Sequence, residues 1–238
     1  MNEKNNKKFN QWLAGLIDGD GYFNLSKKGY ASLEITMEIR DSSCLYKVKN
    51  IFGGSIKAIG NIKALRYRLH NKEGIINIIN AVNGEIRNPT RLAQLFKICE
   101  KYKIKLNYAQ NLSYENAWLS GFIDSDGSVY YNLSSMQVYI TVSQKNKLLL
   151  DLITPIYGGT VYMIKTTDSF KWTVYKKEEV LFITNYLKLN CLYSAKMNRI
   201  RLIPSVYESF SKSIQKSDPL SIEGKKWSSI SNKWNNWS

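Results

Sequence analysis

The sequence has few of the residues on which several common kinds of site depend. Its 238 residues include one histidine, three cysteines and four prolines. A single His70 leaves no basis for a histidine zinc site or a Ser-His-Asp triad. Cys44, Cys99 and Cys191 are scattered and odd in number, which predicts buried thiols rather than a disulfide framework or a Cys-x-x-Cys metal site. Any catalytic chemistry must therefore use carboxylates, lysines, backbone groups or a bound metal.

Long apolar runs are also missing. No stretch approaches the roughly 18 to 20 apolar residues that a bilayer span needs, so no membrane partner is expected. The first residues, MNEKNNKKFN, are polar and carry no apolar signal-peptide stretch, so secretion is not expected. Hydrophobic residues nevertheless make up 44% of the chain, which is enough for a core and excludes wholesale disorder.

Negative charge is scarce. The chain has 34 Lys and Arg residues against 19 Asp and Glu residues, a formal net charge of +15. Such an excess repels itself in the compact state and indicates a polyanionic partner. Lys far outnumbers Arg, and Asn, Ile and Tyr are abundant, which indicates a gene from an A/T-rich genome.

What the chain does contain is a duplication. The segment from Trp12 to Gly21, WLAGLIDGDG, matches the segment from Trp118 to Gly127, WLSGFIDSDG, at an offset of 106. Further on, FGG at 52–54 matches YGG at 157–159 at an offset of 105. Two copies at this spacing are too few and too long for a solenoid, and they indicate two equivalent subdomains related by a pseudo-twofold axis.

Hydrophobic periodicity predicts the same order of elements in both halves. In the first half, helices are expected near 8–19, 43–52, 73–82 and 90–101, and strands near 22–28, 32–40, 55–59 and 64–70. In the second half, one helix is expected to end near 125, with further helices near 146–154, 177–188 and 194–208 and strands near 128–134, 137–144, 160–165 and 170–175. The fold class is therefore α+β, with two pseudo-symmetric αββαββα subdomains that each carry an extra helix. The expected division is 1–102, a polar linker 103–115, a second subdomain 116–208, and a tail 209–238 that the pattern does not place.

Each expected sheet has one apolar face and one polar, basic face. Helices must cover the apolar faces, whereas the polar faces lack the residues that would bury them. A solvated sheet face is the ordinary explanation of such alternation. The net charge and the duplication instead favour a long concave platform for nucleic acid, because the major groove of DNA admits a β-ribbon.

Acidic residues stand where a helix disfavours them. Asp18 and Asp20, and equally Asp124 and Asp126, fall at the C-terminal ends of apolar helices, where the helix dipole is negative. Gly15 and its counterpart are small residues that let two helix backbones approach closely. If the two helices pair across the axis, their ends bring Asp20 and Asp126 together. Two close carboxylates need a cation between them, most simply Mg²⁺, and the backbone carbonyls of the residues before them, Gly19 and Ser125, could add oxygen ligands.

The segments LAGLIDGDG at 13–21 and LSGFIDSDG at 119–127 resemble the two signature motifs of the LAGLIDADG homing endonucleases, in the single-chain, two-motif form. The resemblance extends over about residues 8–208. It implies a monomer whose two sheets form a DNA-binding saddle on a nearly palindromic duplex of about 20 base pairs or more, roughly two helical turns. Family members cut both strands and leave short 3′ overhangs. The resemblance assigns Asp20 and Asp126 as the ligands of Mg²⁺ or Mn²⁺, and the chemistry as metal-assisted phosphodiester hydrolysis.

The family also places a polar residue and a basic residue around the attacking water. The resemblance assigns the polar position to Gln144 and the basic position to Lys196, with Arg91 as its internal counterpart. The counterpart of Gln144 is Ile39, which departs from the family pattern, and Glu38 or Arg40 is the alternative. Lys196 and Arg91 have surface or phosphate contact as an equal alternative. Because the halves differ, the two strand cuts are expected to differ in rate.

Two further groups of residues have less specific expectations. Asp18 and Asp124 are expected to hydrogen-bond neighbouring turns more readily than to hold metal. The expected DNA-contacting residues are those on or beside the polar sheet faces: Tyr22, Asn24, Ser26, Lys28, Ser32, Glu34, Thr36, Glu38, Arg40, Arg66, Arg68, His70, Ser128, Tyr130, Asn132, Gln137, Tyr139, Thr141, Lys171, Thr173 and Tyr175.

Two other functions stay open. An RNA-binding maturase, which helps its host intron to fold, needs the basic surface but not the acids. A DNA-binding regulator with a relict fold does not need them either, so the intact Asp20 and Asp126 favour the nuclease. Family habit and A/T-rich coding together suggest an organellar protein, in either the mitochondrion or the chloroplast.

Overall fold

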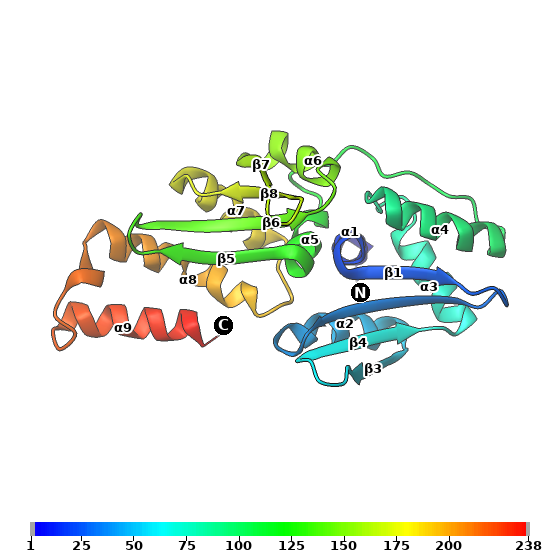
Figure 1. The fold of residues 1–238 in the computed structure, drawn as a ribbon, viewed down its shortest axis with the longest axis horizontal. Helices are drawn as coiled ribbons and strands as arrows, with labels where there is room; N and C mark the ends of the chain where they lie inside the picture. The colour runs from blue at the N-terminus through cyan, green and yellow to red at the C-terminus, as the bar shows by residue number, and fades with distance from the viewer. Residues whose placement is uncertain (1–2, 237–238) are drawn as a thin grey trace.

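Two four-stranded antiparallel sheets, one from each half of the chain, frame the molecule (Figure 1). The computed structural model describes residues 3–236. The strand orders are β1-β2-β4-β3 and β5-β6-β8-β7, so the second half repeats the topology of the first. The predicted α+β class with two pseudo-symmetric halves is confirmed.

The elements follow the predicted order. The first half contains α1 (Glu3–Asp20), β1 (Gly21–Leu25), β2 (Ala31–Glu38), a 3₁₀ turn (Ile39–Asp41), α2 (Ser42–Phe52), β3 (Ser55–Ala58), β4 (Ala64–Leu69), α3 (Lys72–Val82) and α4 (Pro89–Tyr102). The second contains α5 (Trp118–Asp126), β5 (Gly127–Asn132), β6 (Gln137–Gln144), α6 (Leu148–Tyr157), β7 (Thr160–Ile164), β8 (Ser169–Val174), α7 (Lys177–Leu189), α8 (Lys196–Ser211), a 3₁₀ turn (Ile214–Lys216) and α9 (Ile222–Asn235).

Two strands of the first half end two or three residues before their predicted ends. The strand expected over 22–28 ends at Leu25, because the chain turns at Gly29, whose φ is +83°. Lys28 therefore lies in the hairpin turn. The strand expected over 32–40 ends at Glu38, and Arg40 lies in the 3₁₀ turn that follows. His70 directly follows β4 rather than ending it.

Alternation along the strands places one face of each sheet in the core. Leu33, Ile35 and Met37 of β2 are buried, and so are Trp172 and Val174 of β8. Helices α2 and α3 pack on the first sheet, and α6 and α7 pack on the second. Within residues 3–236 no helix covers the opposite, polar faces, because the helices lie behind the strands in Figure 1. We refer to these two faces together as the concave face.

The helices α1 and α5 lie side by side between the sheets and make the most extensive contact between helices (Figure 1). A Cβ added at Gly15 would lie 2.0 Å from the carbonyl oxygen of Trp118, and one added at Gly121 would lie 1.8 Å from that of Trp12. The two backbones thus touch, as the small residues predicted, and only glycine fits at these crossings.

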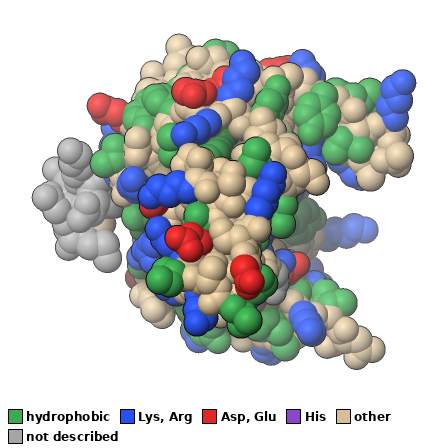
Figure 2. Space-filling model, turned by 90° about the vertical axis from the view of Figure 1, so that its left-hand side faces the viewer, with side chains coloured by type: hydrophobic (Ala, Val, Ile, Leu, Met, Phe, Trp, Pro, Cys, Tyr) green, Lys and Arg blue, Asp and Glu red, His purple; other side chains and the backbone are tan. Residues whose placement is uncertain are grey.

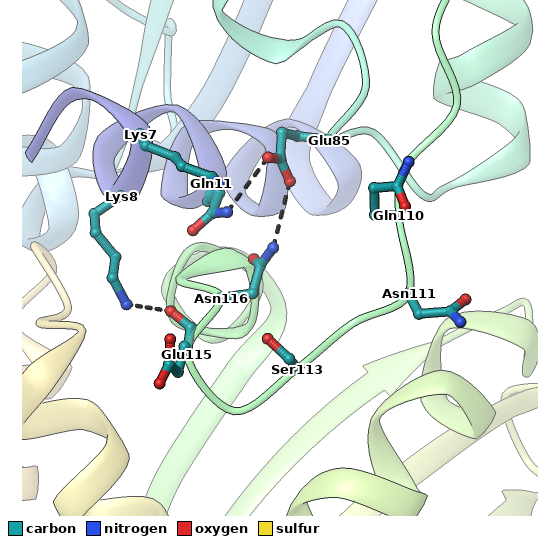
Figure 3. Close-up of a pocket in the computed structure, with 9 residues that line it drawn as sticks. All are labelled: Lys7, Lys8, Gln11, Glu85, Gln110, Asn111, Ser113, Glu115 and Asn116. Carbon is teal, nitrogen blue, oxygen red and sulfur yellow. Dashed lines mark hydrogen bonds between the residues drawn. The ribbon is translucent and has the colours of Figure 1, made fainter. Parts of the chain in front are cut away.

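Between Tyr102 and Trp118 the chain forms neither helix nor strand and runs from one half to the other. Its polar side chains line a pocket of about 430 Å³ near the start of α1 (Figure 3). There Glu85 accepts hydrogen bonds from Gln11 (3.3 Å) and Asn116 (3.4 Å), and Lys8 donates to the backbone carbonyl of Glu115. These mutual contacts attach the connecting segment to α1 and to Glu85, which lies between α3 and α4.

The segment after α8, which the sequence pattern does not place, forms the helix α9. Ser221 begins it by accepting a hydrogen bond from the Gly224 N–H at 3.0 Å, as a capping serine does. Trp234 of α9 packs on Tyr131 of β5, with ring centroids 5.0 Å apart. Within residues 3–236, no helix combines the length and apolarity needed to cross a bilayer.

Candidate functional site

The paired helices α1 and α5 end at Asp20 and Asp126, and both ends meet at the centre of the concave face. A Cβ at Gly19 would lie 2.4 Å from Oδ2 of Asp126 and 2.0 Å from Oγ of Ser125, so the helix ends are in contact. The predicted juxtaposition of the two acids follows from the glycine-mediated crossing of their helices. A pocket of about 390 Å³ beside them is lined by Asp20, Ser125 and Lys196, among others.

The two acids are electrostatically costly in this place. Burial, together with repulsion from Asp126, raises the pKa of Asp20 to about 7, against the attraction of Lys196 and Arg91. Burial likewise raises the pKa of Asp126 to about 6, although Lys196 and hydrogen bonds from Ser125 and Gln144 oppose it. A divalent cation between them would remove both penalties.

Asp18 and Asp124 do different work from the acids two residues later. Asp18 accepts hydrogen bonds from the indole N–H of Trp118 (2.7 Å) and from the backbone N–H of Arg87 (2.7 Å). Asp124 accepts from the indole N–H of Trp12 at 2.8 Å and from two backbone N–H groups. Each buried acid therefore braces its own helix against the other half, in agreement with the expected hydrogen-bonding role.

The structure brings the other predicted site residues to the same helix ends. Gln144 donates to Oδ2 of Asp126 at 2.6 Å from the end of β6. Lys196, the first residue of α8, donates to the carbonyl oxygen of Asp124 at 2.5 Å and approaches that of Ser125 at 3.5 Å. Arg91 of α4 donates to the carbonyl oxygen of Gly19 at 3.2 Å.

The two halves differ at this site. Ile39, at the position equivalent to Gln144, lies in the 3₁₀ turn and is 49% exposed, so Asp20 receives no equivalent amide hydrogen bond among the described contacts. Glu38 and Arg40, the alternatives, form an exposed ion pair with each other at 2.5 Å. The Nε of Arg91 is buried without a hydrogen-bond partner in the described part of the chain, which suits an anion such as a phosphate.

One residue of the site escapes prediction. Asp41 belongs to the first half, yet its Oδ1 accepts a hydrogen bond from the backbone N–H of Ala195 at 2.9 Å, and its Oδ2 lies 3.7 Å from the ammonium of Lys196. It lies outside the repeated motif, and Asn146, at the equivalent position, is exposed. The only signal in the sequence is an acid directly before a helix.

The residues present fit a hard divalent cation that takes part of its ligands from water or from a substrate. Across residues 3–236, no cluster of three or more His, Cys, Asp or Glu side chains could enclose a metal. Two carboxylates and the neighbouring carbonyls of Gly19 and Ser125 are available, so water or phosphate oxygens must supply the remaining ligands. The Gly19 carbonyl is held by Arg91, and the Ser125 carbonyl lies near Lys196.

Most of the expected DNA-contacting residues lie on the concave face. In the first half, Glu34 pairs with Arg68 at 3.0 Å and with Arg66 at 3.6 Å across the strands. In the second half, Tyr130 stacks on Tyr139 at 5.0 Å between ring centroids. The side chains that are exposed or half-buried there, or in the adjoining turns, are Tyr22, Asn24, Ser26, Lys28, Thr36, Glu38, Arg40, His70, Ser128, Asn132, Gln137, Lys171 and Tyr175.

Three residues of the expected set are less available. Ser32, Thr141 and Thr173 point to the polar faces but are only 5%, 2% and 4% exposed. The hydroxyl groups of Thr173 and Tyr162 share a hydrogen bond at 3.0 Å, so an aromatic neighbour covers Thr173. Contact of Thr173 with a ligand would require Tyr162 to move.

The excess positive charge is visible on the surface. Figure 2 faces the end of the molecule where α9 lies, and it shows more Lys and Arg than Asp and Glu side chains. The pair of acids at the ends of α1 and α5 places negative charge at the centre of the concave face.

Comparison with known proteins identifies the family. The profile described as LAGLIDADG endonuclease matches residues 13–105 and 119–207. The chain belongs to this family, as the two motifs indicated.

Similar proteins fall in two functional groups. The chain is 41% identical over 237 residues to the intron-encoded RNA maturase bI4 of Saccharomyces cerevisiae, covering 97% of this chain but 37% of that protein. It is 37% identical over 240 residues to the intron-encoded DNA endonuclease ai2a of Dictyostelium discoideum, covering 98% of this chain and 77% of that one. The fold matches the I-LtrWI LAGLIDADG homing endonuclease bound to target DNA, with a TM-score of 0.69 at 19% identity and 98% coverage of both chains.

Proposed function

We propose that the chain is a site-specific homing endonuclease that makes a double-strand break in a long, pseudo-palindromic DNA site. The reaction is Mg²⁺-dependent phosphodiester hydrolysis that leaves 3′ overhangs. The observation that carries the proposal is the meeting of Asp20 and Asp126 at the centre of a basic concave face, with Gln144, Lys196 and Arg91 around them.

The residues of the chain have separable tasks in this proposal. The two sheets hold the duplex on either side, through Arg66, Arg68 and the tyrosine row among others. Asp20 and Asp126 would hold Mg²⁺, which when bound lowers the pKa of a water and stabilises the charge on the leaving 3′ oxygen. Gln144 orients the carboxylate of Asp126, while Lys196 and Arg91 supply positive charge beside the reacting phosphate.

A cleavage assay with mapped ends tests the proposal. The wild type is incubated with a library of A/T-rich organellar DNA and Mg²⁺, and the new ends are sequenced. We expect paired ends with short 3′ overhangs at one long site. Asp20→Asn and Asp126→Asn should each lower cleavage at least about 100-fold, because they remove a ligand rather than an outer partner. Binding of the same duplex should persist.

A matched control is available on the outer surface. Asp151 of α6 pairs with Lys147 at 2.9 Å and is exposed. Asp151→Asn therefore removes the same charge at a place away from the ends of α1 and α5. It should cleave like the wild type. The proposal is wrong if the wild type makes no cut, or if both site variants cut as fast as the control.

A second function has its own support. The 41% identity to a protein named as an RNA maturase favours a role in the splicing of a host intron, with the intron RNA as partner. The relatives are named as intron-encoded, which suits an organellar, most simply mitochondrial, location. Splicing of the host intron by an Asp20→Asn, Asp126→Asn double variant separates the two functions, since a maturase keeps its activity without the acids.

A further inference from the structure

The contact between Asp41 and Lys196 joins the two halves of the molecule at one side of the site. Asp41 ends the 3₁₀ turn after β2 in the first half and is only 7% exposed. Its carboxylate spans the start of α8, with one oxygen on the Ala195 N–H and the other near the Lys196 ammonium. A carboxylate at a helix N-terminus is stabilising, so this position also favours the start of α8.

The equivalent corner of the other half is built differently. The equivalent of α8 is α4 in the first half, and Asn88, also in the first half, caps it by accepting a hydrogen bond from the Thr90 N–H at 3.0 Å. Asn146, the counterpart of Asp41, accepts a hydrogen bond from the N–H of Leu148 in its own half. Arg91 therefore has no carboxylate in the position that Asp41 takes beside Lys196.

We propose that Asp41 is a positioning residue for Lys196, and that its loss slows the cleavage of one DNA strand only. This inference rests on the proposed nuclease function. The ammonium of Lys196 is held between the Asp41 carboxylate and the carbonyl oxygen of Asp124, which fixes a long side chain that is otherwise free to move. Oδ1 of Asp41 accepts the hydrogen bond from Ala195, and Oδ2 faces the ammonium of Lys196. The interaction with Lys196 is therefore one of charge, and it is separate from the hydrogen bond to Ala195.

Strand-resolved kinetics provide the first test. The duplex recovered in the cleavage assay carries a different dye on each strand, and the two cleavage rates are measured with Mg²⁺. Lys196→Met identifies the strand that depends on Lys196. Asp41→Asn keeps an acceptor for Ala195 but loses the charge, and it should slow that same strand about 10-fold, as losing an outer positioning partner does. The other strand should stay within about twofold. The double variant should be no slower on that strand than Lys196→Met alone, because the two residues act as a unit.

Asn146→Ala is the matched control, since it changes the equivalent position of the other half. It should leave the ratio of the two strand rates unchanged. Equal slowing of both strands by Asp41→Asn, or no slowing of either, overturns the inference. So does an additive double variant. Thermal unfolding of each variant separates these results from a loss of the fold.

A second measurement needs neither DNA nor metal. Acetic anhydride labels lysine amines, and peptide mass spectrometry reads the extent of labelling at Lys196. Release from Asp41 makes the amine more accessible, so Asp41→Asn should raise labelling of Lys196 severalfold relative to the exposed Lys145 in the same sample. Unchanged labelling overturns the positioning role even if the protein is a nuclease. Absence of cleavage by the wild type instead overturns the proposed function and the strand effect with it, while the labelling still decides whether Asp41 holds Lys196.

Discussion

At the scale of single residues, position along one helix decides what an acid does. Asp18 and Asp20 are two residues apart in α1, and burial raises the pKa of both to about 7. Asp18 is surrounded by donors from Trp118 and Arg87, whereas Asp20 faces a second acid. Both of these hydrogen bonds reach Oδ2 of Asp18, whereas its Oδ1 is buried without a hydrogen-bond partner in the described part of the chain. The pair formed by Asp20 and Asp126 concentrates negative charge, which Lys196 and Arg91 offset in part and which a bound cation would balance.

The raised pKa of Asp20 predicts an effect of pH on stability. The pKa of Asp20 is about 7 in the folded protein against an ordinary value of 3.8, so the folded state binds more protons between these values. The Asp20 contribution to stability is therefore present at low pH and lost as pH rises towards 7. Asp20→Asn removes the charge, so in EDTA it should be more stable than the wild type at pH 8 by about 1 to 3 kcal/mol, and by less at pH 5.

Chemical denaturation at the two pH values measures this difference, with Asp151→Asn as the control that should show no such trend. Adding Mn²⁺ at pH 8 should then stabilise the wild type more than Asp20→Asn, because the metal binds the folded state through this carboxylate. A variant less stable than the wild type at pH 8 would contradict the prediction.

The sequence shows most but not all of the site at this scale. Asp20 and Asp126 were predictable because the motif is repeated and each acid stands at an unfavourable helix end. Asp41 was not, because its partners Ala195 and Lys196 are more than 150 positions away and nothing in the local pattern links them. The asymmetry at Ile39 was visible in the aligned halves, but its exposed place in a 3₁₀ turn was not.

At the scale of elements, the crossing of α1 and α5 sets the geometry of the site. Gly15 and Gly121 leave no room for a side chain, since a Cβ at either would lie 2.0 Å or less from a backbone oxygen of the other helix. Gly15→Ala should force the helices apart and cost at least about 2 kcal/mol of stability. It should also separate Asp20 from Asp126 and so reduce cleavage more than the lost stability explains.

Urea denaturation and the cleavage assay test both parts together. Asn10 is a half-buried position of the same helix, and Asn10→Ala serves as the control because alanine favours the helix. If Gly15→Ala unfolds and cleaves like Asn10→Ala, the close crossing does not control the site.

Elements were predictable where their periodicity is strong and less so where a local turn or tertiary packing decides. The strand alternation in β2 and β8 gives the buried faces correctly, whereas the β1–β2 turn depends on Gly29. The apolar residues of α9, Trp227, Ile230 and Trp234, do follow helical spacing. They stand among so many Ser, Lys and Asn residues that only packing on Tyr131 and Phe210 makes the helix evident.

At the scale of the whole molecule, positive charge predominates on the surface, whereas negative charge is concentrated at the ends of α1 and α5. The formal net charge is +15, and basic side chains predominate on the surface in view in Figure 2, whereas Asp20 and Asp126 concentrate negative charge at the centre of the concave face. A duplex laid across both sheets would meet positive charge along its flanks and acids only at its middle. That arrangement binds phosphates at the edges and leaves room for cations where the strands are cut.

The salt dependence of DNA binding tests this distribution. If six or more phosphates are neutralised, the logarithm of the affinity should fall with the logarithm of KCl concentration with a slope of magnitude about 5 or more. Arg66 and Arg68 lie on the concave face and pair with Glu34 there, so replacing both with Gln should reduce that magnitude by about 1 to 2. Lys188 lies in the last turn of α7, which packs on the opposite face of the second sheet, so Lys188→Gln should leave the slope unchanged. Titration of a dye-labelled duplex at several KCl concentrations in EDTA measures all three slopes. A slope near zero for the wild type would mean that the charge serves something other than a polyanion, and equal slopes for the two variants would mean that the concave face does not hold the duplex.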